Sequence, residues 1–393
     1  MKKIKVAFFA EILIEDFDGA SRTMFQLIKR IDPDRFEFLF ICGTGPDQLS
    51  GFECLKIPVI TLPINSSYTM ALPVLVKTTI KEKLQEFMPD VIHIATPSLL
   101  GNFALRYGQK NQLPVLTIYH THFISYIDYY LKHTPFLINK VKQMVAESHK
   151  TFYNQCSQVY VPSESIKDEL IMMGIEIGRM KIWKRGMDTL LFSPKRKNTN
   201  YLNELMGNNL PTILFASRLV WEKNLDTLFS IYDLIQQKDI KVNFLIAGDG
   251  IAKASCEARM KNAVFTGKVD HHTLAVLYAS ATLFVFPSVS ETYGNVVLEA
   301  MASGLPCVIA DGGGSKDFIE QGSNGFKCAP YDPEDYVEKI QLVLKNRLIR
   351  DQFICKGLEQ CRELDWGKLT NVYFNDLQEL ASQSQLALEK SYD

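Results

Sequence analysis

The sequence predicts an α/β protein built from two doubly wound, mostly parallel sheets. Short apolar segments of strand length alternate with amphipathic helical segments almost throughout the chain. A polar stretch that contains proline and glycine interrupts this alternation of strands and helices, which resumes after it. The length of 393 residues also favours two domains, at roughly 150 residues per domain.

Each half of the chain contains five apolar runs with the composition of strands buried on both faces. These runs cover residues 5–13, 36–42, 91–95, 114–120 and 158–163 in the first half, and 212–219, 242–250, 263–269, 282–288 and 306–311 in the second. Helical segments such as 21–31 and 77–87 separate them, and the stretch 193–211 is the expected linker. We therefore expect a Rossmann-like domain over 1–195, a second over 205–370, and a C-terminal helix over 371–393. Packing of this helix on the first domain is one arrangement that the sequence allows.

Composition and charge argue against a nucleic-acid-binding protein. The chain has 43 Lys and Arg against 44 Asp and Glu, which gives a net charge of −1 and no overall basic field. Residues 1–197 carry a modest basic excess. This excess suits an anionic partner, but it is also what an ordinary solvated surface would show.

The cysteines and the start of the chain favour a cytoplasmic protein. Eight cysteines are scattered without CxxC pairs or metal-ligand spacing, so we expect reduced thiols in the core. Glu11 interrupts the first apolar segment too early for a signal peptide, and no apolar stretch reaches about 18 residues. The expected location is the cytoplasm, with the inner surface of a membrane as a further option.

Residues 290–314 contain the most informative pattern of the sequence. Glu291 and Glu299 stand eight positions apart and bracket a loop and the start of an apolar helix. Backbone N–H groups at a helix start can hold phosphate, and Gly294 lets a ligand approach the backbone closely. A buried carboxylate at Glu299 would accept hydrogen bonds from sugar or ribose hydroxyls. The alternative is a solvated helix with an accidental pair of glutamates.

Three further elements follow strands of the second half. Arg218 stands where a strand is expected to end, and Lys223 follows five residues later; an Arg fork and a Lys charge together suit a diphosphate. Gly248 with its neighbouring glycine permits a tight turn, and Val269 is a candidate border for a nucleotide base. From spacing alone, each of these remains compatible with an ordinary surface loop.

The blocks SRLVWEKN, AGDG, FPSVSETYGNVVLEAMASGLPCV and GGG, in this order, resemble the GT-B glycosyltransferases of family 4. That resemblance implies two Rossmann-like domains facing across a cleft, and retaining transfer of a hexose from a nucleotide-sugar donor to an acceptor hydroxyl. It implies that Arg218 and Lys223 bind the donor diphosphate, that Glu291 contacts the donor sugar and that Glu299 contacts the ribose. No cofactor and no metal are implied. The loop would supply backbone contacts to the donor from Thr292, Tyr293, Gly294, Asn295 and Val296.

The first half adds weaker candidates. Gly19 stands where the family often has two adjacent glycines, and it is followed here by Ala20, so a phosphate contact would use backbone amides. His120 comes at the expected end of a strand, and the resemblance implies that it contacts the donor sugar. His93 is more typical of a core residue. His122 is less certain than His120, and Arg185 is a candidate for approaching the diphosphate or the acceptor.

Segments 90–107, 119–130 and 185–194 resemble the subgroup of diacylglycerol or phosphatidylinositol mannosyltransferases and sulfolipid synthases. This resemblance implies glycolipid biosynthesis, with GDP-mannose or UDP-glucose as donor and a lipid as acceptor. Segment 126–150 mixes aromatic and basic side chains, which suits an anionic membrane surface or packing against its own sheet. A soluble sugar or polysaccharide acceptor, and a non-catalytic nucleotide-sugar-binding role, remain alternatives.

Overall fold

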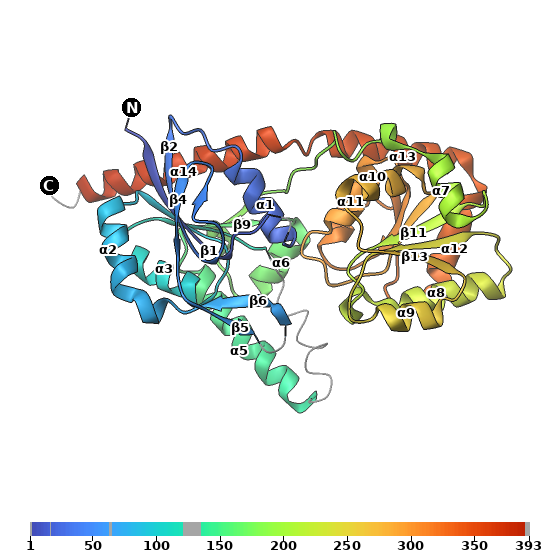
Figure 1. Cartoon of the computed structure of the whole chain (residues 1–393), viewed down its shortest axis with the longest axis horizontal. Helices are drawn as coiled ribbons and strands as arrows, with labels where there is room; N and C mark the ends of the chain where they lie inside the picture. Colours follow the sequence, from blue (N-terminus) through green and yellow to red (C-terminus); the bar gives the residue numbers. More distant parts are fainter. Residues whose placement is uncertain (1, 16, 63–64, 121–134, 390–393) are drawn as a thin grey trace. The chain divides into compact units, whose positions relative to one another are not determined.

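A computed structural model of the chain describes residues 2–15, 17–62, 65–120 and 135–389 (Figure 1). Residue contacts divide the chain into two compact units. The chain enters the second unit between Lys184 and Arg185 and returns to the first between Trp366 and Gly367. This division lies earlier than the stretch 193–211 that the sequence suggested as a linker, and part of that stretch forms helix α7 (Thr199–Met206), which contributes Leu202 to the second core.

The first unit is built around a sheet in the order β10-β9-β8-β7-β1-β2-β4-β3. All neighbours run parallel except β3 and β4. A separate antiparallel pair, β5 and β6, also belongs to this unit. The strands are β1 (Ile4–Ile12), β2 (Phe36–Thr44), β3 (Gln48–Leu49), β4 (Phe52–Lys56), β5 (Val59–Leu62), β6 (Asn65–Ala71), β7 (Val91–Ile94), β8 (Val115–Ile118), β9 (Gln158–Val161) and β10 (Met180–Ile182).

Helices of this unit begin where the sequence provides capping side chains. Asp18, Ser98 and Ser163 accept hydrogen bonds from backbone amides at the starts of α1, α3 and α6. The helices are α1 (Gly19–Ile28), α2 (Lys77–Phe87), α3 (Leu99–Lys110), α5 (Pro135–Tyr153), α6 (Glu164–Met172) and α14 (Trp366–Glu389), with the short 3₁₀ helices η1 (Pro73–Val76) and η2 (Ile177–Arg179).

Helix α14, red in Figure 1, packs on the sheet of the first unit through polar and aromatic contacts. Asp376 accepts a hydrogen bond from the Tyr160 hydroxyl at 2.6 Å, and the Tyr373 hydroxyl lies 2.9 Å from His93 Nδ1. His93 also stacks on Phe8, with ring centroids 4.1 Å apart. Burial lowers the pKa of His93 to about 3. His93 is therefore a neutral core residue that helps to seat α14.

The second unit contains a fully parallel sheet in the order β13-β12-β11-β14-β15-β16. Its strands are β11 (Thr212–Ala216), β12 (Asn243–Ala247), β13 (Ala263–Gly267), β14 (Leu283–Phe286), β15 (Cys307–Ala310) and β16 (Gly325–Cys328). Its helices besides α7 are α8 (Leu225–Gln237), α9 (Lys253–Arg259), α10 (His271–Ser280), α11 (Asn295–Ala302), α12 (Pro333–Lys345) and α13 (Arg347–Arg362). Three 3₁₀ helices are η3 (Pro194–Arg196), η4 (Trp221–Lys223) and η5 (Gly314–Phe318).

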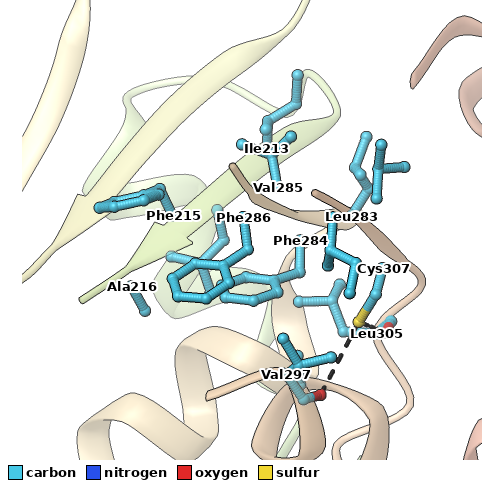
Figure 2. Close-up of a cluster of buried hydrophobic side chains, with 14 of the residues drawn as sticks. Ile213, Phe215, Ala216, Leu283, Phe284, Val285, Phe286, Val297, Leu305 and Cys307 are labelled. Carbon is cyan, nitrogen blue, oxygen red and sulfur yellow. Dashed lines mark hydrogen bonds between the residues drawn. The ribbon is translucent and has the colours of Figure 1, made fainter. Parts of the chain in front are cut away.

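The core of the second unit fixes α11 against the sheet (Figure 2). Phe284 and Phe286 of β14 stack with ring centroids 5.7 Å apart. The Cys307 thiol lies 3.9 Å from the carbonyl oxygen of Val297 in α11, and both residues are fully buried. Burying such side chains contributes roughly 1.5–3 kcal/mol each. A helix anchored in this way can hold functional groups at its N-terminus in a fixed place.

The expectation that all the cysteines are core thiols is confirmed for seven of them and is wrong for Cys355, which is exposed on α13. Burial raises the pKa of Cys42 and of Cys361 to about 12, so these thiols stay protonated. Within the described part of the chain, none of the helices combines the length and the apolar character needed to cross a membrane.

Candidate functional site

The second sheet reverses its strand order between β11 and β14. From β11 the chain builds outward to β12 and β13, and then it returns to place β14 on the other side of β11. The loops that follow these two neighbouring strands leave the same edge of the sheet, and ligands of open α/β sheets bind in the crevice at such a point. Arg218 and Lys223 follow β11, and Glu291 follows β14. The sequence-predicted charges of the second half therefore meet at one place.

Lys223 and Glu291 form an ion pair at this edge. The Lys223 ammonium contacts Glu291 Oε1, and the Ser288 hydroxyl donates a hydrogen bond to the same oxygen at 3.0 Å. The side chains are only 6% and 17% exposed. Burial alone would raise the pKa of the Glu291 carboxyl, but the Lys223 charge and the hydrogen bonds from Lys223 and Ser288 outweigh it and lower that pKa. Glu291 is thus held as a carboxylate.

This pair predicts a pH dependence of stability. Because the pKa of Glu291 is lower in the folded chain than its ordinary value of 4.5, the folded chain binds fewer protons there than the unfolded one. The stabilisation is present above that ordinary value and is lost as the pH falls through the lowered one. We expect the free energy of unfolding to fall more between about pH 6 and about pH 3 in wild type than in Glu291→Gln. The exposed Glu257→Gln should follow wild type; equal slopes for wild type and Glu291→Gln would contradict the assignment.

Asn224 explains how Lys223 reaches Glu291. It adopts a left-handed conformation at the end of η4, with φ +54°, and it donates hydrogen bonds to the carbonyl oxygens of Pro287 at 3.1 Å and Pro330 at 3.0 Å. The Ser290 hydroxyl donates to the carbonyl oxygen of Glu222 at 2.8 Å. The contacts to Pro287 and from Ser290 join the loop after β11 to the loop after β14, and the contact to Pro330 joins it to the loop after β16. The sequence motifs did not predict these contacts, because the partners are backbone carbonyls far away in the chain.

Arg218 presents its guanidinium at the surface of this cluster. Its side chain is 58% exposed, and Nη2 lies 3.8 Å from the buried carboxylate of Glu222. At 3.8 Å the two groups are beyond hydrogen-bond distance, so the guanidinium is not held by Glu222. Arg218 is therefore available to a ligand, and its charge also helps to lower the pKa of Glu291.

The loop before α11 is shaped by close backbone contacts. Gly294 has φ +83°, and a β-carbon there would lie 2.5 Å from Ser315 Cβ. The Gly314 amide donates a hydrogen bond to the Glu291 carbonyl at 2.6 Å, and a β-carbon on Gly314 would lie 2.2 Å from the Thr292 carbonyl oxygen. Only glycine fits at these two positions. The GGG motif is thus a support for the loop of residues 291–294.

The remaining residues of this loop differ in which of their atoms a ligand can reach. The Tyr293 side chain is buried, so only its backbone can meet a ligand, while Asn295 and Val296 are half-buried at the start of α11 and Thr292 is buried. Glu299 lies one turn further along α11, also buried, and accepts a hydrogen bond from the Tyr278 hydroxyl at 3.4 Å. Glu299 therefore belongs to α11, the helix that begins directly after this loop.

The AGDG motif forms the neighbouring turn after β12. Gly248 has φ +146°, and a β-carbon there would lie 1.8 Å from the Ser217 carbonyl oxygen. The Leu219 amide donates to the Asp249 carbonyl at 2.8 Å, so the turn packs on the backbone that carries Arg218. The Gly248 amide donates to the Gly267 carbonyl at 2.9 Å, which brings the segment containing Val269 to this edge as well.

Two family profiles match the chain. Residues 17–190 match "Glycosyltransferase Family 4" and residues 203–360 match "Glycosyl transferases group 1", so that together they cover more than half of the chain. The chain belongs to these glycosyltransferase families. The resemblance inferred from the sequence motifs is therefore confirmed.

Named relatives of this glycosyltransferase have related activities. Sulfoquinovosyl transferase SQD2 of Arabidopsis thaliana is 32% identical over 75% of the chain, but the chain spans only 57% of that protein's length. A GDP-mannose-dependent alpha-mannosyltransferase of Corynebacterium glutamicum is 28% identical over 83% of the chain and 76% of the relative. Alpha-monoglucosyldiacylglycerol synthase of Streptococcus pneumoniae is 29% identical over 59% of the chain and 54% of the relative.

Solved structures support the fold. Anabaena Alr3699/HepE, crystallised in complex with UDP, superposes with a TM-score of 0.74 over 96% of the chain and 100% of that protein, at 18% identity. The expected architecture of two Rossmann-like, parallel-sheet domains of the GT-B type is therefore confirmed.

In this glycosyltransferase, His120 and Gly19 belong to the first unit. His120 follows β8 at the carboxyl end of the strand and is buried. Gly19 is the first residue of α1, whose amide at Ser21 is already capped by Asp18 at 2.8 Å. Their donor contacts stay predictions. His122 and the beginning of the expected membrane segment, residues 126–134, lie outside the described residues.

The resemblance to family 4 implies no metal site. Among the residues that the structure describes, no group of three or more His, Cys, Asp or Glu side chains is arranged to hold a metal ion. Lys223 contacts Glu291, and the charge of Arg218 also lowers the pKa of that carboxyl. That the glycosyltransferase works without a metal stays a prediction.

Proposed function

We propose that the chain is a retaining hexosyltransferase that moves a hexose from a nucleotide sugar to an acceptor hydroxyl without a metal. The observation that carries this proposal is the cluster at the reversal point of the second sheet. Lys223 pairs with the carboxylate of Glu291 there, and the nearby Arg218 pairs with Glu222 and adds its charge to lower the pKa of Glu291, next to a glycine-shaped helix start. Cations suit a diphosphate, and carboxylates suit sugar hydroxyls.

Each group of the cluster has a role in this reaction. Arg218 and Lys223 bind the diphosphate and offset the charge that develops on it as the sugar leaves, in the place of a divalent cation. Glu291, kept ionised by Lys223, accepts a hydrogen bond from a hydroxyl of the donor sugar. Glu299 receives the ribose hydroxyls, and the amides from Thr292 to Val296 contact the donor, with Gly248 and Val269 bordering the nucleotide. In the first unit, His120 contacts the donor sugar and Gly19 the phosphate.

Retention follows from attack on the face that the leaving group departs from. The bond between the anomeric carbon and the phosphate oxygen breaks, and the acceptor oxygen bonds to the anomeric carbon on the same face. The departing phosphate takes the proton of the acceptor hydroxyl, so no side chain has to serve as the base. The protein then contributes mainly by holding the diphosphate and by excluding water.

The acceptor in this proposal is a lipid such as diacylglycerol or a phosphoinositide, reached from the cytoplasmic face of an anionic membrane. The relative named monoglucosyldiacylglycerol synthase supports this choice. Helix α5 presents the exposed Lys140 and the largely exposed Met144, a pairing that suits a bilayer surface. The donor in this proposal is GDP-mannose or UDP-glucose. The name of the GDP-mannose-dependent relative supports the first, and the UDP complex of the structural neighbour is compatible with the second.

Nucleoside diphosphate release tests the proposal. Purified protein in EDTA is incubated with UDP-, GDP- and ADP-hexoses, with and without vesicles that contain diacylglycerol and an anionic phospholipid. We expect release from one donor, stimulated by the vesicles. Release that is independent of vesicles, with transfer to soluble sugars, would favour a soluble acceptor. No release, together with donor binding measured by calorimetry, would favour the non-catalytic alternative.

A further inference from the structure

The Tyr293 side chain points into the interior of the second unit. It is 1% exposed, and its ring packs edge-on against Phe318, with centroids 4.7 Å apart. Its hydroxyl donates a hydrogen bond to the backbone carbonyl of Arg185 at 2.9 Å, and the Arg185 guanidinium lies 5.4 Å from the ring centroid. The residue next to Gly294 is therefore fastened to a segment 108 positions earlier in the chain.

Arg185 is where the chain enters the second unit. Two residues later, the Met187 amide donates to the Leu364 carbonyl at 2.7 Å. Between them, Gly186 packs on the Trp366 indole so closely that a β-carbon would lie 2.4 Å from the ring. The entering segment 185–187 and the leaving segment 364–366 thus run side by side, and Tyr293 is tied to the first of them.

Helix α11 needs such an anchor. Its N-cap is Gly294, which has no side chain, and no described side chain caps the helix start. Gly294 is also the position with the least backbone restriction in the loop, at φ +83°. Tyr293 is directly before it and supplies a fixed point. Tyr293 thus adds, on the N-terminal side of Gly294, a fixed point to the core contacts that hold the body of α11.

We propose that Tyr293 is a positioning residue whose hydroxyl, bound to the Arg185 carbonyl, holds the helix-start amides of residues 294–296 in the orientation that binds the donor diphosphate. This inference rests on the proposed function, because it assigns the donor to these amides. It also makes the entering segment 185–187 sensitive to the ligand, since the same hydrogen bond joins the two.

The test compares Tyr293→Phe with Tyr336→Phe. Both changes remove one hydroxyl from a buried tyrosine, but the Tyr336 hydroxyl has no hydrogen-bond partner among the described residues, so its removal is the matched control. Binding of UDP and GDP is measured by calorimetry, and hydrogen exchange is followed by mass spectrometry with and without nucleotide. For Tyr293→Phe we expect about three- to tenfold weaker binding, as for loss of one hydrogen bond, and faster exchange at 185–187 and 294–297. Tyr336→Phe should match wild type in both.

The outcomes separate the inference from the function on which it rests. If wild type binds UDP or GDP and Tyr293→Phe binds it equally well, the positioning role is overturned while the proposed function stands. If wild type binds neither nucleotide, the proposed function fails. Even then, exchange in the ligand-free proteins decides whether the hydrogen bond holds the loop: identical exchange in Tyr293→Phe and Tyr336→Phe would overturn it.

Discussion

Arg218→Ala and Lys223→Ala should each lower turnover by at least about a hundredfold. Both side chains are assigned to the diphosphate, where their charge matters most as the sugar leaves. Arg218 is the cleaner test, because its side chain is 58% exposed and makes only a 3.8 Å ion pair with Glu222, whereas Lys223 is buried against Glu291. Turnover is measured as nucleoside diphosphate release at saturating donor and acceptor.

Lys223→Ala also leaves the poorly exposed Glu291 without its partner, so lost folding must be separated from lost chemistry. Thermal unfolding of each variant provides that separation, and the double variant Lys223→Ala/Glu291→Ala removes the unpaired charge. Lys238→Ala is the matched control, because this lysine pairs with Glu334 on the surface of the second unit. If either Arg218→Ala or Lys223→Ala turned over like wild type, the assignment of that side chain to the donor diphosphate would be contradicted.

Gly248→Ala should destabilise the protein by about 3 kcal/mol. Its β-carbon would lie 1.8 Å from the Ser217 carbonyl oxygen, and its φ of +146° is unfavourable for any other residue. Because backbone cannot rotate out of the way as a side chain can, the turn after β12 and the segment that carries Arg218 must both shift. The measurement is the free energy of unfolding from urea titration.

Gly322→Ala separates the two causes. Its φ is also positive, at +74°, but no described atom lies within 4 Å of its β-carbon position. It should therefore show only the conformational cost, about 1 kcal/mol. If Gly248→Ala were no less stable than Gly322→Ala, the close contact between the AGDG turn and the Ser217 backbone would be refuted.

The apolar runs of the sequence were enough to predict the fold. All ten predicted strands are present; nine of them are buried along most of their length, and β13 is half-buried. The strands that went unpredicted are short or only partly buried, as β4 and β10 are, and β16 contains a glycine. The β5–β6 pair is an antiparallel addition, which the rhythm of alternating strands and helices does not predict.

The charges of the site were predictable from motifs, but their supports were not. Arg218, Lys223 and Glu291 were found as residue types in a pattern, and the structure brings these three together. Asn224 and Ser290 act through bonds to backbone carbonyls more than 60 positions away in the chain, and nothing in a local pattern indicates such partners.

Tyr293 illustrates the same limit. Its place in the loop predicted a backbone contact to the donor, and that contact remains a prediction. Its side chain, by contrast, bonds to Arg185, a pairing set by where the chain enters the second unit. Such a contact depends on the packing of two distant segments, so it emerges only from the folded structure.

The stereochemistry of the product tests the central claim most directly. The protein is incubated with α-configured UDP-glucose and GDP-mannose in the presence of diacylglycerol vesicles, and the configuration at the anomeric carbon of the purified glycolipid is determined by NMR. Retaining hexosyl transfer predicts an α-linked product from one of the two donors. A β-linked product, or release of free hexose with no transfer to any acceptor, would contradict it.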